Sequence, residues 1–126
     1  MRKIALIFTF SFLFISCEKE NQDILIGKWK LVKGYSSMGG YYIPNVQDQR
    51  MEEYRKDNIR IRYNFEGNEI VRCNYSATKY TVTIYGKELN GDTWSSHYDY
   101  WFKHDTLAIK NDGGFEFYNE YFIRVK

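Results

Sequence analysis

The fold is decided by the stretch LIGKWKLV, residues 25–32. Trp29 and Leu31 share one parity, and the lysines beside them share the other, which is typical of a strand with one buried and one solvated face. Gly27 allows the backbone to turn tightly into this stretch. The pattern therefore predicts the first strand of a β domain, onto which the later strands have to close.

Alternation with a period of two continues along the chain. In residues 59–65 the apolar set contains Ile61 and Tyr63, while Arg60 and Arg62 are expected to face water. Further strands are predicted at residues 71–75, 80–85, 94–103, 107–109, 115–118 and 121–126. Short turns with Gly at residues 66–68, 90–92 and 112–114 join several of them.

About eight antiparallel strands predict an all-β fold, an up-and-down β-barrel with at most one short helix. The helix is expected at Val46–Asp57, where Met51 and Tyr54 are three residues apart among charges and Asn45 could cap the first turn. Residues 34–45 are expected to form a loop. A two-sheet sandwich is the alternative architecture.

The two ends of the predicted domain resemble one known superfamily. The Gly27-x-Trp29 pattern at the first strand, with Arg124 near the end of the chain, resembles the lipocalins, and more closely the short bacterial lipocalin-like lipoprotein domains. The resemblance implies that Trp29 plugs the closed end of the barrel and that Arg124 covers it. We then expect Trp29 and Arg124 to lie within about 6 Å in a cation–π contact. Otherwise Trp29 is simply a large core residue.

The first residues predict export. Arg2 and Lys3 precede the apolar run Ile4–Ile15, which is too short to span a bilayer but suits a secretory signal. The following Ser16-Cys17 resembles a bacterial lipobox, which implies that the Cys17 thiol carries lipid. The expected organisation is a lipoprotein signal peptide at residues 1–16, a lipidated tether at residues 17–23 and a lipocalin-like barrel at residues 24–126.

An acylated Cys17 would attach the protein to a membrane, because two or more chains such as palmitate give stable anchoring. Glu18 follows in place of the Asp associated with retention in the inner membrane, so the outer membrane of a bacterial cell envelope is expected. The sequence does not distinguish the periplasmic face of that membrane from the cell-surface face. The alternative is an ordinary signal peptide with a Cys in this place by chance.

The net charge argues against a nucleic-acid-binding protein, and the cysteine content argues against a fold held by disulfides. The chain has 18 Lys and Arg against 16 Asp and Glu, and removal of Arg2 and Lys3 with the signal leaves 16 against 16. A net charge near zero argues against a nucleic-acid partner. With Cys17 acylated, Cys73 has no partner for a disulfide, and it is expected to be a small buried residue.

No catalytic, metal or cofactor site is predicted. His97 and Asp99 share a face of one predicted strand, but a stable metal site needs a third ligand, and His104 has the opposite parity. Ser95 and Ser96 beside His97 hold the residue types of a triad, yet neighbours on one strand cannot converge as a triad must. Phosphate loops, paired-Cys motifs and nucleophile elbows are not found.

Ligand binding is the remaining interpretation. All 12 Tyr and all three Trp lie after the predicted signal, and such residues favour strands and binding surfaces. The inward candidates that would line a small apolar ligand are Ile61, Tyr63, Val82, Ile84, Tyr98 and Tyr100. Alternatively, exposed Tyr85, Trp94 and Trp101 recognise a glycan or a protein, or the lipoprotein is structural and takes no small ligand.

Overall fold

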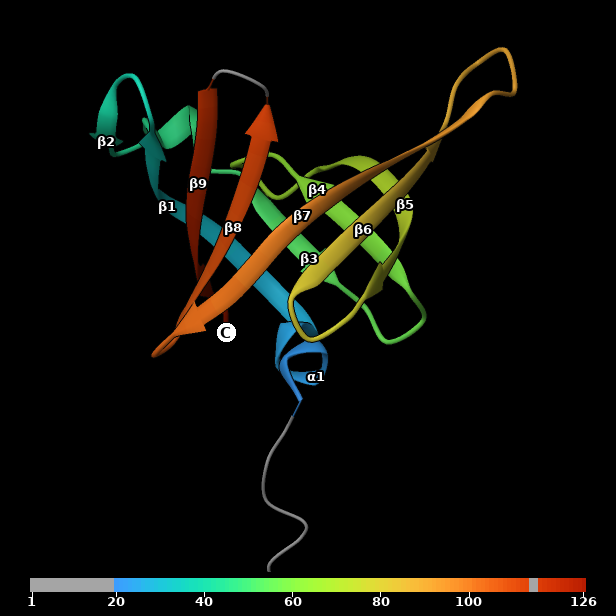
Figure 1. Cartoon of the computed structure of the whole chain (residues 1–126), viewed down its shortest axis with the longest axis horizontal. Helices are drawn as coiled ribbons and strands as arrows, with labels where there is room; N and C mark the ends of the chain where they lie inside the picture. The colour runs from blue at the N-terminus through green and yellow to red at the C-terminus, as the bar shows by residue number, and fades with distance from the viewer. Residues whose placement is uncertain (1–19, 114–115) are drawn as a thin grey trace, which may run out of the picture.

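Nine strands and one short α-helix follow one another in residues 20–113 and 116–126, the part of the chain that this computed structural model describes (Figure 1). They are α1 (Asn21–Leu25), β1 (Gly27–Ser36), β2 (Gly40–Tyr42), the 3-10 helix η1 (Val46–Asp48), β3 (Met51–Tyr54), β4 (Ile59–Tyr63), β5 (Glu69–Ala77), β6 (Thr81–Lys87), β7 (Thr93–Lys103), β8 (Thr106–Gly113) and β9 (Glu116–Arg124).

The strands form a closed antiparallel barrel. From β3 to β9 each strand pairs with the next, β3 pairs with β1, and β1 also pairs with β9, with Trp29 opposite Arg124 and Ser36 opposite Tyr118. Eight strands therefore make the barrel, while the extra strand β2 pairs only with the end of β1. The predicted all-β, up-and-down barrel is confirmed, and the two-sheet sandwich is excluded.

The apolar core fills one half of the barrel interior. It consists of Leu25, Trp29, Leu31, Tyr54, Tyr75, Val82, Ile84, Tyr100, Leu107, Ile109 and Phe122. Helix α1 lies across this end of the barrel (Figure 1), with Leu25 fully buried and the side-chain amide of Asn21 donating to the carbonyl of Lys79 at 2.8 Å. We call this the closed end, and the opposite end the open end. Helix α1 begins within the segment expected to be a tether.

The helix predicted at Val46–Asp57 is wrong. Only η1 is helical there, and β3 follows it, pairing with both β1 and β4. Met51 and Tyr54 are three apart, but the burial alternates, with Glu52 and Tyr54 inside. Closure of the barrel between β1 and β4 overrides the local helical pattern, because β3 hydrogen-bonds with both neighbours.

The predicted faces of β4 are also reversed. Across the strand pairs, Arg60 lies opposite Tyr54 and Arg62 lies opposite Glu52, and Tyr54 is a core residue. Residues opposite one another share a face of the sheet. The two arginines therefore point into the barrel, and the alternating residues Ile61 and Tyr63 point outward.

The predicted signal peptide and Cys17 lie outside the described residues. Within residues 20–113 and 116–126, none of the helices is long and apolar enough to cross a membrane.

Candidate functional site

The open end of the barrel holds a cavity of about 320 Å³. Its lining comes from inward-facing positions of β3 to β9 and from the residue just before β3. The lining residues are Arg50, Glu52, Tyr54, Arg60, Arg62, Val71, Ile84, Trp94, Tyr98, Ile109, Asn111 and Glu120. This volume is at the lower end of the range of small-molecule sites.

Five charged residues of this lining, Arg50, Glu52, Arg60, Arg62 and Glu120, form what we call the charged cluster. Its centre is Oε1 of Glu52, which accepts hydrogen bonds from Nη2 of Arg60 at 2.7 Å, Nη2 of Arg62 at 3.1 Å and Nε of Arg50 at 3.1 Å. The Glu52 side chain is only 3% exposed. A buried carboxylate is stable there because three guanidinium groups replace its water.

A second carboxylate extends the cluster across the barrel. Nη2 of Arg50 donates to Oε2 of Glu120 on β9 at 2.6 Å, so Arg50 joins the two glutamates. The side chains of Arg50 and Glu120 are about a quarter exposed, and that of Arg62 is 35% exposed, whereas that of Arg60 is 7% exposed. The cluster thus runs from the barrel interior to the solvent at the open end.

The cluster keeps its charges over a wide pH range. Burial alone would raise the pKa of Glu52, but the charges of Arg60, Arg50 and Arg62 lower it to about 2. Burial is the largest effect and lowers the pKa of Arg60, but Glu52, with smaller contributions from Tyr54 and Cys73, raises it by more, so the net shift is upward. Burial and Glu52 together raise the pKa of Tyr54, so its neutral hydroxyl donates to Oε2 of Glu52 at 3.2 Å.

The remaining lining is largely apolar. Val71, Ile84 and Ile109 contribute aliphatic groups, and Trp94 and Tyr98 contribute rings. The site therefore combines an apolar wall with fixed charges, an arrangement that suits molecules with both an apolar and a polar part.

The structure brings together only some of the residues expected to line a ligand. Ile84 and Tyr98 line the cavity. Val82 and Tyr100 also point inward, but they are fully packed in the core near the closed end. The expectation for Ile61 and Tyr63 is wrong, because both lie on the outer face, where the Tyr63 hydroxyl donates to Glu53 at 2.7 Å.

Sequence reasoning missed the whole charged cluster. Arg60 and Arg62 alternate with apolar residues, and charged residues in such a pattern are normally solvated. One signal was present: in MEEY, residues 51–54, Glu52 and Tyr54 have the same parity. Reading this stretch as a strand places Glu52 beside the arginines of the next strand.

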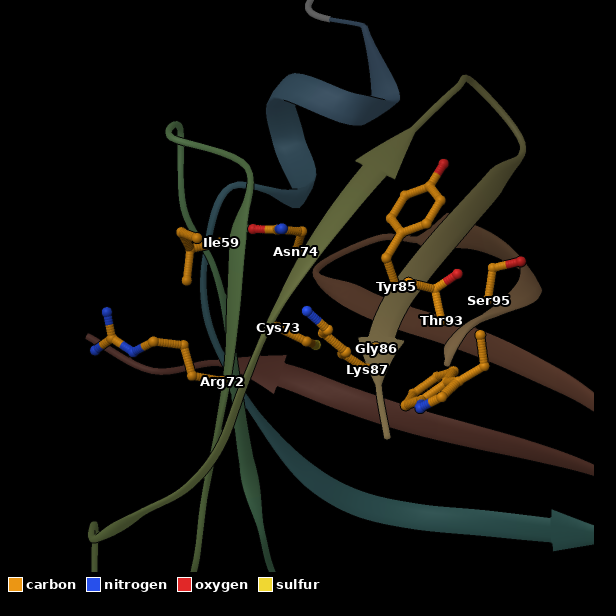
Figure 2. Close-up of a pocket in the computed structure, with 10 residues that line it drawn as sticks. Ile59, Arg72, Cys73, Asn74, Tyr85, Gly86, Lys87, Thr93 and Ser95 are labelled. Carbon is orange, nitrogen blue, oxygen red and sulfur yellow. The ribbon is translucent and has the colours of Figure 1, made fainter. Parts of the chain in front are cut away.

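A wide groove opens in the side of the barrel, with a volume of about 910 Å³. It exists because β5 and β6 pair only between Asn74–Tyr85 and Ala77–Val82, and then separate toward the open end. Figure 2 shows Arg72 on one side of this lateral groove and Tyr85, Thr93 and Ser95 on the other. The cavity and the lateral groove have Trp94 in common.

Gly86 is required beneath the Trp94 ring. A Cβ at this position would lie 2.1 Å from the Cε2 and Cζ2 atoms of Trp94. The indole is therefore held against the β6 backbone, between the cavity and the lateral groove. Of the other two residues considered for surface recognition, Tyr85 also lines this groove, whereas Trp101 does not.

The closed end has the expected contact. The guanidinium of Arg124 lies 4.3 Å from the ring centroid of Trp29, within the predicted limit of about 6 Å. Arg124 also donates to the carbonyls of Ile26 at 3.0 Å and Ile24 at 2.6 Å. Gly27 has a φ of 142°, and a Cβ there would lie 2.3 Å from Nη1 of Arg124. Only glycine fits this position without displacing the arginine.

Among residues 20–113 and 116–126, no group of three or more His, Cys, Asp or Glu is placed to hold a metal ion. His97 instead lies beside Thr83, with 2.8 Å between Nδ1 and Oγ1. Cys73 is partly buried against the core, and its Sγ lies 3.8 Å from the carbonyl oxygen of Arg60.

No model of a known protein family matches the chain, and no curated protein matches it significantly. The structure itself is an eight-stranded antiparallel β-barrel, an architecture compatible with the lipocalin-like fold.

Proposed function

We propose that this protein is a membrane-anchored bacterial lipoprotein whose barrel binds a small, largely apolar ligand in the open-end cavity. The observation that carries the proposal is the cavity itself, about 320 Å³ of space enclosed by inward side chains of seven strands. Covering apolar surface contributes roughly 25 cal/mol per Å², which is sufficient for micromolar affinity in a site of this size.

Tyr98 is used for the test because its side chain lines the cavity and also packs against the buried core. A larger side chain there distinguishes an empty cavity from a packed interior. Tyr98→Trp should reduce the space and weaken binding of the neutral fluorescent probe 1-naphthylamine, which is small enough for the cavity, at least fivefold. The melting temperature should stay nearly unchanged, since the larger ring enters an empty volume. Probe titration and thermal unfolding measure the two effects.

The matched control is Tyr80→Trp, because Tyr80 is exposed and outside the cavity. It should alter neither probe affinity nor melting temperature. The proposal is contradicted if the wild-type protein binds no probe and Tyr98→Trp costs about 1–3 kcal/mol of stability, the effect of overfilling a packed core.

The proposed anchor is a lipid on Cys17, supported by the apolar run before it and by the preceding Ser16. Cys17→Ala should convert a membrane-bound protein into an unprocessed or soluble one. Detergent-phase partitioning and intact mass would measure this change. Cys73→Ala is the control, since Cys73 packs against the barrel core and should not affect attachment. Unchanged partitioning and mass in Cys17→Ala would refute the anchor.

Surface recognition is the second candidate function, and the lateral groove favours it. Aromatic side chains of Tyr85 and Trp94 lie there beside Arg72, Asn74 and Lys87, a mixture that suits a glycan or a protein partner. If the wild-type protein binds no probe, the lateral groove becomes the favoured binding site.

A further inference from the structure

The charged cluster carries one positive charge in excess. Its three arginines face two glutamates. Arg50 contacts both carboxylates, whereas Glu52 supplies the carboxylate that Arg60 and Arg62 contact in the described part of the chain. Since a guanidinium has five N–H donors, both arginines keep donor capacity beyond these bonds.

Part of this donor capacity is buried. The Nε atoms of Arg60 and Arg62 are shielded from solvent and have no hydrogen-bond partner among the residues that the structure describes. The Arg60 side chain is more than nine-tenths buried, so it cannot turn toward bulk water. Buried donors are nearly always paired in native proteins, and leaving one unpaired is costly. A negatively charged group in the cavity would offset the excess positive charge of this wall and would accept hydrogen bonds from N–H groups of the arginines that line it.

Building on the ligand-binding function proposed above, we propose that the cavity takes a small amphipathic carboxylate. Its carboxylate lies against Arg60 and Arg62, because the planar guanidinium group matches carboxylate geometry and charge-assisted bonds of this type are strong. Its hydrocarbon part lies against Ile84, Trp94 and Tyr98 on the apolar wall.

Other ligand classes fit the site less well. A neutral apolar molecule would cover the two arginines without supplying acceptors, and a cation would be repelled by the excess charge. Size gives a further limit. At about 30 Å³ for each water-sized group, a cavity of about 320 Å³ holds a molecule of roughly ten non-hydrogen atoms. An eight-carbon fatty acid has this size.

The test compares ligands that differ only in the head group. Octanoate, 1-octanol and octylamine are titrated into the full chain at pH 7, with displacement of 1-naphthylamine and calorimetry as readouts. Octanoate should bind at least about tenfold more tightly than octanol, the scale expected for a charge-assisted hydrogen bond. Octylamine should bind more weakly than octanol. This comparison uses the wild-type protein and is independent of any variant's folding.

The variant Arg62→Gln tests whether this arginine causes the preference for octanoate. It should reduce the preference for octanoate over octanol to less than about threefold while leaving octanol affinity nearly unchanged. Arg55→Gln is the matched control, because the exposed Arg55 side chain pairs with Asp57 and lines neither the cavity nor the lateral groove. It should preserve the full preference.

Three results would overturn the inference, and each has a different meaning. Equal affinity for octanoate and octanol removes the carboxylate assignment but leaves the ligand-binding function intact. A preference of more than tenfold for octyl phosphate over octanoate assigns the arginines to phosphate groups. If the probe does not bind and none of the ligands gives heat, the proposed function fails as well.

Discussion

Replacing Glu52 with glutamine is expected to lower the free energy of unfolding by about 3–5 kcal/mol, the usual cost of removing one partner from a buried ion pair. Glutamine keeps the size of the side chain and one carbonyl acceptor, so the loss comes from charge. Arg50, Arg60 and Arg62 would lose the carboxylate oxygen to which all three donate. Urea unfolding followed by tryptophan fluorescence measures the change.

Glu53 supplies the matched control on the same strand. Its side chain lies on the outer face and accepts a hydrogen bond from the Tyr63 hydroxyl at 2.7 Å. Glu53→Gln should cost less than about 1 kcal/mol, since a neutral acceptor replaces an accessible charged one. Equal stability of the two variants would show that Glu52 does not hold the arginines in place.

The pH dependence of stability gives an independent check. Burial opposes ionisation of Glu52, but the arginines lower its pKa from 4.5 to about 2 in the folded protein. A depressed folded-state pKa contributes stability above the unfolded value and loses it as pH falls through the folded value. The wild-type melting temperature should therefore drop between pH 4.5 and pH 2, and this drop should be smaller in Glu52→Gln.

Strand alternation predicted the barrel correctly where the outer face is polar. Val82 and Tyr98 were expected on one interior and lie directly opposite each other in the β6–β7 pair. Threonines separate the inward residues of β6, and charged or small polar residues separate most of those of β7, so the two faces differ clearly in polarity. In such strands the sequence alone is sufficient to assign the faces.

The same rule failed in β4, where both faces are unusual. Arg60 is buried because Glu52, eight residues earlier in the chain, supplies its counter-charge. Ile61 is 2% exposed although it lies on the outer face, where Glu53 and Arg72 are its neighbours across the adjacent strands. Both environments come from neighbouring strands, which the pattern of one strand does not contain.

The candidate site was therefore less predictable than the fold. The cavity depends on where packing of the core stops, and the lateral groove depends on the point at which β5 separates from β6, after Asn74 and Tyr85. Both are long-range properties. Turn residues and alternation fix the order of the strands, but they do not fix how far each pair of strands remains together.

Trp29→Ala is expected to lower the free energy of unfolding by about 3–5 kcal/mol, the usual cost of removing a large buried aromatic ring. Trp29 is 2% exposed, packs 5.8 Å from the Phe102 ring between centroids and donates from Nε1 to the carbonyl of Leu25 at 2.9 Å. Its loss would leave a cavity beneath α1 and an unpaired carbonyl. Trp101→Ala is the control, because Trp101 is 38% exposed, and it should cost about 1 kcal/mol or less.

A double-mutant cycle measures the interaction energy between Trp29 and Arg124. Arg124→Met keeps an apolar chain over Trp29 but removes the cation and the donors to Ile24 and Ile26. The coupling energy between Trp29→Ala and Arg124→Met should be about 0.5–2 kcal/mol, the range of a partly desolvated cation–π contact. Additive effects would mean that Arg124 acts through the carbonyls at the end of α1 alone. Packing of Trp29 and those hydrogen bonds would then stabilise the closed end independently, and the cation–π contact would contribute nothing.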